Sequence, residues 1–166
     1  MAAPTRFTNE CEFSQPCTFV GAVSLPSGTV TNANIATAAG IVASKLVSRR
    51  SIGYGQPNSA ATTETRVVFA CYGTTATVLQ FAAGSIAKAV GDSTVTIDLK
   101  KNGSSILSAV ITLDSGNTNR LLETATLSST ALVAGDWLEI VITATVGTGT
   151  LPTGVFVRLL LDEDPA

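Results

Sequence analysis

The chain has 166 residues, enough for one compact domain with its own core and an extension. Charged residues make up only 13%, the formal net charge is -2, and the one basic cluster is small, with Lys45, Arg49 and Arg50. This balance argues against a nucleic-acid-binding protein, which needs a concentrated cationic surface. No run of about 18 apolar residues is present, so we expect no membrane-spanning helix.

Residues 1–60 are predicted to form an extended N-terminal arm and linker with little regular structure. Prolines and glycines recur through this range, and they disfavour long strands and helices. The segment 36–47 has partial helical spacing of apolar residues. Gly40 and the β-branched residues weaken this pattern, so we expect a few helical turns at most.

The arm is rich in apolar side chains, which a free arm would leave in water. The hydrophobic effect therefore favours packing of the arm against another surface, either on its own domain or on a partner. The sequence leaves both arrangements open. The residues that we expect to bind a partner are Phe13, Phe19, Val23, Leu25, Ile35, Ile41, Leu46, Arg49 and Arg50.

The cysteines Cys11, Cys17 and Cys71 are an odd number at unrelated spacings. No apolar signal-peptide region follows the N-terminal residues, so we expect synthesis in a cytoplasm and free thiols. A disulfide between Cys11 and Cys17 is the less favoured alternative. Cys71 lies in an apolar strand pattern, which is typical of an unreactive core thiol.

Residues 61–166 are predicted to form an antiparallel β-sandwich of jelly-roll type. After a polar hinge at 56–63, short apolar or alternating segments recur between turns rich in Gly, Asn, Asp and Ser. An immunoglobulin-like Greek key is the alternative topology. The expected strands cover residues 64–72, 76–83, an irregular edge at 86–90, a hairpin at 93–113, and then 120–127, 138–146 and 154–161.

The hairpin at 93–113 is expected to turn at Asn102 and Gly103, which tolerate positive φ. A two-residue loop there would point the apolar residues of the second strand toward water. We therefore favour a three-residue loop with Gly103 in a bulge, which pairs Ile97 with Leu107 on the core face.

The sequence offers little for catalysis, and we expect no enzyme. It contains no histidine, the commonest general base near neutral pH and the commonest zinc ligand. Aromatic residues amount to 5%, which disfavours the aromatic groove that usually surrounds a glycosidase carboxylate pair. Segment 114–119 has oxygen donors for calcium, but Asp and Asn are also ordinary turn residues. We assign no metal and no cofactor.

Two parts of the chain resemble virion proteins of tailed bacteriophages. Residues 25–46, with Leu-Pro-Ser-Gly-Thr-Val-Thr-Asn-Ala-Asn-Ile followed by Ala-Ser-Lys-Leu, are similar to the N-terminal linker of such proteins. Residues 95–107 and the Ala-Gly-Asp turn at 134–136 are similar to the jelly-roll domain that follows that linker. In this turn the family's aspartate bonds to turn amides. We expect Trp137, which comes next, to lie in the core or an interface rather than on a carbohydrate platform.

The resemblance implies a structural protein of the virion, of the capsid decoration (cement) or head-fibre type. We expect a homotrimer on the outer surface of the major capsid protein, synthesised in the host cytoplasm, that stabilises the shell without nucleic acid, membrane or cofactor. The alternative is a head or tail fibre module that binds host surface glycans through loops 114–119 and 147–154. Residues 155–161 carry apolar side chains on both faces of a strand, which favours a partner covering one sheet face.

Overall fold

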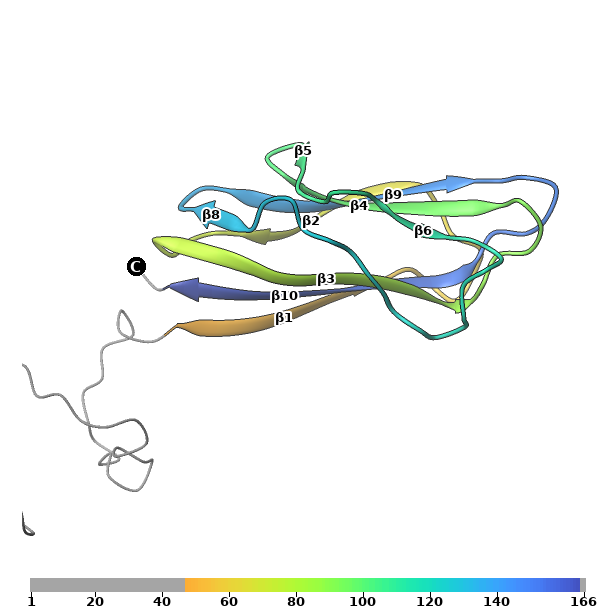
Figure 1. Ribbon diagram of the computed structural model, residues 1–166, viewed down its shortest axis with the longest axis horizontal. Coiled ribbons are helices and arrows are strands. Elements are labelled where there is room, and N and C mark those ends of the chain that lie inside the picture. Colours follow the sequence, from red (N-terminus) through yellow and green to blue (C-terminus); the bar gives the residue numbers. More distant parts are fainter. Residues whose placement is uncertain (1–46, 165–166) are drawn as a thin grey trace, which may run out of the picture. The chain divides into compact units, whose positions relative to one another are not determined.

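The computed structural model describes residues 47–164, which form two antiparallel sheets packed face to face (Figure 1). Residues 1–46 lie outside the described residues, and with them most of the predicted arm, nearly all of the predicted helical segment and the cysteines Cys11 and Cys17. No helix in residues 47–164 has the length and apolar character to cross a membrane. The strands are β1 (Ser48–Gly55), β2 (Glu64–Ala70), β3 (Thr75–Ala87), β4 (Thr94–Lys101), β5 (Ser104–Ser105), β6 (Ile111–Leu113), β7 (Glu123–Thr124), β8 (Ala131–Val133), β9 (Trp137–Thr145) and β10 (Thr153–Asp164).

The order of the strands is that of a jelly roll. Sheet A has the order β1-β10-β3-β7, with β8 also paired to β3, and sheet B has the order β2-β9-β4-β5, with β6 also paired to β4. The first four strands alternate between the sheets, and the last two each insert between two of them, β9 between β2 and β4 and β10 between β1 and β3. The predicted jelly-roll sandwich is confirmed, and the immunoglobulin-like alternative does not fit this order.

Most predicted strands are present, but the sequence analysis missed β1 and β8. The predictions for 64–72, 76–83, 138–146 and 154–161 are confirmed as β2, β3, β9 and β10, of which β3 and β10 are longer than expected. The predicted strand 120–127 shrinks to the two residues of β7. The sequence analysis missed β8, whose three residues are too few for a clear alternation.

Strand β1 corrects the predicted extent of the arm. All eight of its residues pair with β10, from Ser48 opposite Glu163 to Gly55 opposite Phe156, so they belong to the sandwich. The residues after β1 stay attached to it, because the Gln56 amide donates to the Val155 carbonyl oxygen and Ala60 forms a bridge with Thr153. The prediction of little regular structure up to residue 60 missed this strand because β1 is an edge strand with mostly exposed side chains. Its backbone pairing with β10, rather than an apolar alternation, holds it in the sheet.

The hairpin after β4 also differs from the prediction. Lys101 pairs with Ser104, so the loop has two residues, Asn102 and Gly103, with φ of 49° and 84°. The predicted pairing of Ile97 with Leu107 is wrong, because Ile97 lies opposite Ile111. The Ile106 amide still donates to the Leu99 carbonyl oxygen, but residues 107–110 leave the sheet edge before β6 begins. The resulting shift of register by an odd number of residues returns the apolar residues of β6 to the core face.

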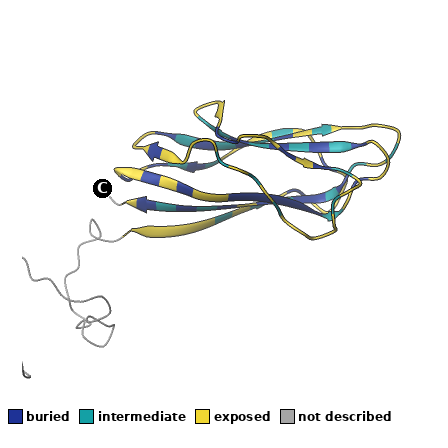
Figure 2. Ribbon diagram, in the orientation of Figure 1, coloured by how far each residue is buried: buried dark blue, intermediate teal, exposed yellow. Residues whose placement is uncertain are grey.

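The core lies between the sheets and consists mainly of aliphatic side chains. Alternate residues of β4, β9 and β10 are buried, whereas β1 is largely exposed (Figure 2). Leu107, displaced from the predicted pairing, is still buried and forms an isolated bridge with Leu127. The largest fully buried side chains are Phe81, Ile97, Leu99, Leu113, Leu132, Leu138, Ile140, Ile142, Leu159, Leu161, Val78 and Val95.

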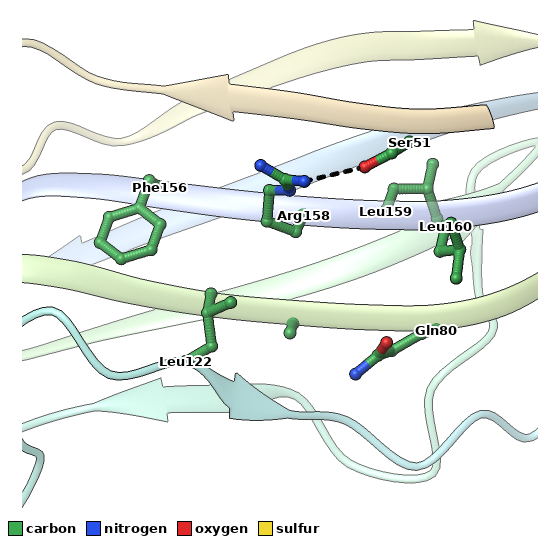
Figure 3. A pocket seen from close by; sticks show the side chains of 8 residues that line it. Ser51, Gln80, Leu122, Phe156, Arg158, Leu159 and Leu160 are labelled. Carbon is green, nitrogen blue, oxygen red and sulfur yellow. Dashed lines mark hydrogen bonds between the residues drawn. The ribbon is translucent and has the colours of Figure 1, made fainter.

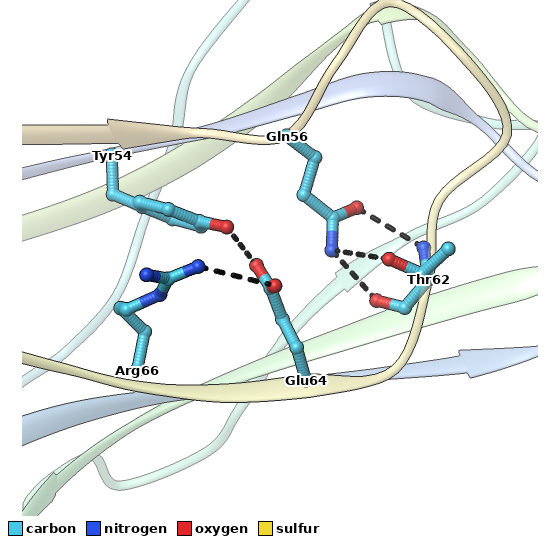
Figure 4. Close-up of polar contacts among 5 residues, drawn as sticks. All are labelled: Tyr54, Gln56, Thr62, Glu64 and Arg66. Atoms are coloured by element: carbon cyan, nitrogen blue, oxygen red, sulfur yellow. Dashed lines mark hydrogen bonds and ion pairs between the residues drawn. The ribbon is translucent and has the colours of Figure 1, made fainter.

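The connection from β1 to β2 joins the two sheets at one edge (Figure 4). Gln56 donates through Nε2 to the carbonyl oxygen of Thr62 at 2.7 Å, and its Oε1 accepts from the Thr62 amide at 3.2 Å. The Tyr54 hydroxyl donates to Glu64, and the Arg66 guanidinium lies 5.2 Å from the Tyr54 ring centre. Burial, followed by this hydrogen bond, raises the pKa of Tyr54. The predicted hinge is therefore a connection fixed by reciprocal hydrogen bonds.

Gly84 on β3 lies where an added methyl group has no room. A Cβ atom at Gly84 would overlap the carbonyl oxygen of Leu121 and lie 2.9 Å from Cζ of Phe156. We expect Gly84→Ala to lower the free energy of unfolding by roughly 1–3 kcal/mol, the usual cost of overpacking. Urea unfolding followed by circular dichroism measures this change.

Gly53 on β1 provides the matched control for Gly84. The nearest atoms to a Cβ at Gly53 lie at 3.7 and 3.8 Å, which is ordinary van der Waals contact. Gly53→Ala is therefore expected to leave the free energy of unfolding nearly unchanged. Equal losses in the two variants would contradict the steric explanation for Gly84.

Candidate interaction surface

A depression of about 390 Å³ lies on the outer face of sheet A (Figure 3). On β10, Phe156, Arg158 and Leu160 alternate with buried residues and so point away from the core. Arg158 lies opposite Gly53 on β1 and Ala82 on β3, and these small neighbours leave the surface hollow. We call this the sheet A depression; it is lined by Ser51, Gln80, Ala82, Leu122, Phe156, Arg158, Leu159 and Leu160.

Arg158 is a cation in largely apolar surroundings. Its Nη2 donates to Oγ of Ser51 at 3.0 Å. Among residues 47–164, no carboxylate lies within ion-pair distance of its guanidinium. Leu122, on the other side of the depression, keeps 39% of its surface exposed. The sheet A depression therefore presents apolar side chains together with a guanidinium that has no carboxylate partner within residues 47–164.

Arg49 and Arg50, two of the predicted partner-binding residues, lie near the start of β1, at one end of the sandwich. Arg49 forms two hydrogen bonds with Asp162, of 2.7 and 2.8 Å, and Nη2 of Arg50 lies 2.9 Å from Oε2 of Glu163. These ion pairs join β1 to β10 and engage both guanidinium groups. Binding of a partner protein by Arg49 and Arg50 stays a prediction. The other predicted partner-binding residues, Phe13 to Leu46, lie outside the described residues.

Glu163 links β1 and the 72–73 turn at this end of the sandwich, where β1 starts and β10 ends. We call it the entry end. Its side chain accepts hydrogen bonds from the amides of Tyr72 and Gly73, at 3.1 and 3.0 Å, and is nearly buried, at 5% exposure. The turn it holds presents the Tyr72 side chain at 87% exposure. The sequence analysis did not single out Tyr72, because an aromatic residue at a strand end does not reveal its exposure.

Asp136 ties two turns together at the entry end. Its Oδ2 accepts from the Val133 amide at 2.9 Å, and its Oδ1 accepts from Nδ2 of Asn102 at 2.6 Å. Asp136 therefore bonds to the amide of the last residue of β8, directly before its own turn. Trp137 is half-buried, and its amide donates to Oδ1 of Asn102 at 3.0 Å.

The bonds to Asp136 predict a defined acid dependence of stability. The Val133 amide, and then the Asn102 side chain, lower the pKa of Asp136 from its ordinary value. A carboxylate whose pKa is lowered in the folded state stabilises the fold above about pH 4. This contribution to stability is lost as the pH falls through the lowered pKa. We therefore expect Asp136→Asn to be less stable than the wild type at pH 7, with a difference that shrinks below about pH 4. Urea unfolding between pH 7 and pH 2 measures it, and a constant difference would contradict the assignment.

The two loops considered for glycan binding both bond to the β3–β4 connection, at the opposite end of the sandwich. In segment 114–119, the Ser115 carbonyl oxygen accepts from Nζ of Lys88 at 2.8 Å. In segment 147–154, Oγ1 of Thr148 donates to Asp92 at 2.9 Å. Lys88 and Asp92 both belong to the connection between β3 and β4. This connection starts after Ala87, which pairs with Thr153, the first residue of β10. The entry end lies instead at the last residues of β10, so the two ends are opposite. We call this second end the loop end.

Segment 114–119 has the internal hydrogen bonds of a turn. Oδ1 of Asp114 accepts from the Gly116 amide at 2.7 Å, and Oδ1 of Asn117 accepts from the Asp114 amide at 2.5 Å. Across residues 47–164, no three His, Cys, Asp or Glu side chains gather as metal ligands would. Cys71 is buried as predicted, and burial, with the nearby Glu163 and Asp136 carboxylates, raises the pKa of its thiol.

Comparison with known proteins adds no relative to this picture. No protein-family model matches the chain, and no curated protein matches it.

Proposed function

We propose that the chain is a structural protein of a virion, a decoration (cement) protein that binds the outer surface of the major capsid shell as a homotrimer and stabilises it. It carries out no catalysis and needs no cofactor. The observation that carries the proposal is the sheet A depression, where Phe156, Leu160 and Leu122 remain partly in water around Arg158. An apolar surface with a cation that no described carboxylate neutralises is suited to a protein partner.

The placement of the two ends supports an orientation on the shell. The chain joins the sandwich at Ser48, at the entry end, where the predicted arm would leave toward the capsid. The loops at the other end would then face away from the shell. The sequence similarity to phage virion linkers in residues 25–46 supports the same assignment of the arm.

Mixing the purified chain with capsids that lack it tests the proposal. We expect co-sedimentation with the capsids, a native mass of three chains for the free protein, and a higher temperature of capsid disruption when the protein is bound. Binding without any rise in that temperature would contradict the stabilising role. A monomer by native mass measurement would contradict the trimer.

The second candidate function is a head or tail fibre module that binds host surface glycans. It is favoured by one observation, that segments 114–119 and 147–154 both lie at the loop end, away from the entry end. A glycan array probed with the full chain tests this function. Binding that is lost on substitution of Asn117 and Thr148 would favour the fibre module over the decoration protein.

A further inference from the structure

The sheet A depression has the features of a binding site for a short peptide segment. Its floor includes the small residue Ala82, and Phe156 and Leu160 supply apolar contact. Arg158 offers guanidinium donors beyond the one that reaches Ser51. A matching occupant needs a carboxylate to pair with Arg158 and an apolar or aromatic side chain beside it.

The chain's own sequence contains such a segment outside the described residues. Residues 7–13 read Phe-Thr-Asn-Glu-Cys-Glu-Phe, so two carboxylates are flanked by two aromatic rings. Glu10 and Glu12 are the only Asp or Glu residues in the sequence from 1 to 46. Within that range, charge complementarity to Arg158 therefore selects this segment alone.

We propose that the sheet A depression binds residues 7–13 of a second copy of the chain, with Glu10 or Glu12 paired to Arg158. This inference rests on the proposed trimer. A closed ring of three copies joins two different surfaces of each copy, and the depression and the segment are such a pair. Residues 14–47 connect the segment to β1 and span up to roughly 110 Å when extended, enough to reach a neighbour.

A disulfide trap tests the inference with the full chain, because Cys11 already lies inside the segment. In a Cys17→Ser background, Gln80→Cys places a thiol at the rim of the depression. The matched control is Thr143→Cys, an exposed position on β9 in sheet B. Under mild oxidation we expect Gln80→Cys to link chains through Cys11 into covalent dimers and trimers, as seen by non-reducing electrophoresis and peptide mass mapping. The control is expected to stay largely unlinked.

Charge exchange tests the role of Arg158 in the same assay. Arg158→Glu is expected to lower the yield of linked chains by about tenfold or more, as for the loss of an interfacial ion pair. Adding Glu10→Arg and Glu12→Arg to that variant is expected to restore the yield. Because Arg158 is exposed, circular dichroism should confirm that each variant is folded.

Three results would overturn the inference. They are a link from Cys11 to residue 80 within one chain, equal linking of Gln80→Cys and the Thr143→Cys control, or a yield unaffected by Arg158→Glu. The assay contains no capsids, so it is separate from the test of function. Failure here with capsid binding intact would reject only this inference, whereas failure of capsid binding would reject the proposed function.

Discussion

Removal of residues 1–46 is expected to abolish binding to capsids while the sandwich stays folded. The described strands and their core lie within residues 48–164, so the deletion removes none of them. It removes the apolar side chains of the predicted arm, including Phe19 and Ile41, which we propose to contact the shell. Co-sedimentation with capsids measures the binding, and far-ultraviolet circular dichroism with a cooperative urea transition reports the fold.

The deletion must end before β1, and a longer deletion shows why. Removing residues 1–55 would also delete β1, whose Ile52 and Tyr54 lie opposite Leu159 and Val157 and pack against the core. That variant is expected to be destabilised, so its loss of binding would have two causes. Capsid binding by a folded chain that lacks residues 1–46 would contradict the role of the arm.

Glu163→Gln is expected to lower the free energy of unfolding by roughly 2–3 kcal/mol, as for the loss of charge-assisted hydrogen bonds at a buried site. One carboxylate oxygen accepts from two amides, of Tyr72 and Gly73, and the other faces Arg50. A glutamine can keep the amide contacts, but its NH₂ group would then point donors at the guanidinium. Urea unfolding at pH 7 measures the loss.

The neighbouring pair on the same strands is the control for Glu163. Asp162 also pairs with an arginine of β1, but its partner Arg49 is largely exposed, and exposed ion pairs contribute little. Asp162→Asn is therefore expected to cost markedly less than Glu163→Gln. Equal losses would show that the burial of Glu163 and its bonds to the 72–73 turn do not set its contribution.

The two-layer fold could be predicted because several strands carry a clear alternation. In β4, Val95, Ile97 and Leu99 are buried while the residues between them reach the surface. Strand β1 could not be predicted in this way. Its sequence, Ser-Arg-Arg-Ser-Ile-Gly-Tyr-Gly, has little alternation, and its place in sheet A depends on pairing with a strand at the other end of the chain.

The register of the hairpin shows the limit of local reasoning. The positive φ values at Asn102 and Gly103 follow from their residue types. The departure of residues 107–110 from the sheet does not, because Leu107 bridges Leu127, a residue outside the hairpin. Choosing the loop length from the apolar pattern alone assumed an uninterrupted strand, and that assumption produced the wrong pairing.

The sheet A depression was only partly visible in the sequence. The apolar residues on both faces of 155–161 indicated that one sheet face would be covered by a partner, and Phe156 and Leu160 do point outward. The hollow itself depends on Gly53 and Ala82, which three-dimensional pairing places beside Arg158. Such neighbours from distant strands have no local sequence signal.

Imaging the virion at a resolution that traces the chain tests the central claim most directly. The account predicts trimers of the sandwich on the outer surface of the major capsid shell. Each entry end, with Ser48 and Glu163, should face the shell, and segments 114–119 and 147–154 should face the solvent. Finding the chain at the tip of a head or tail fibre, or on the shell with its loop end inward, would contradict the account.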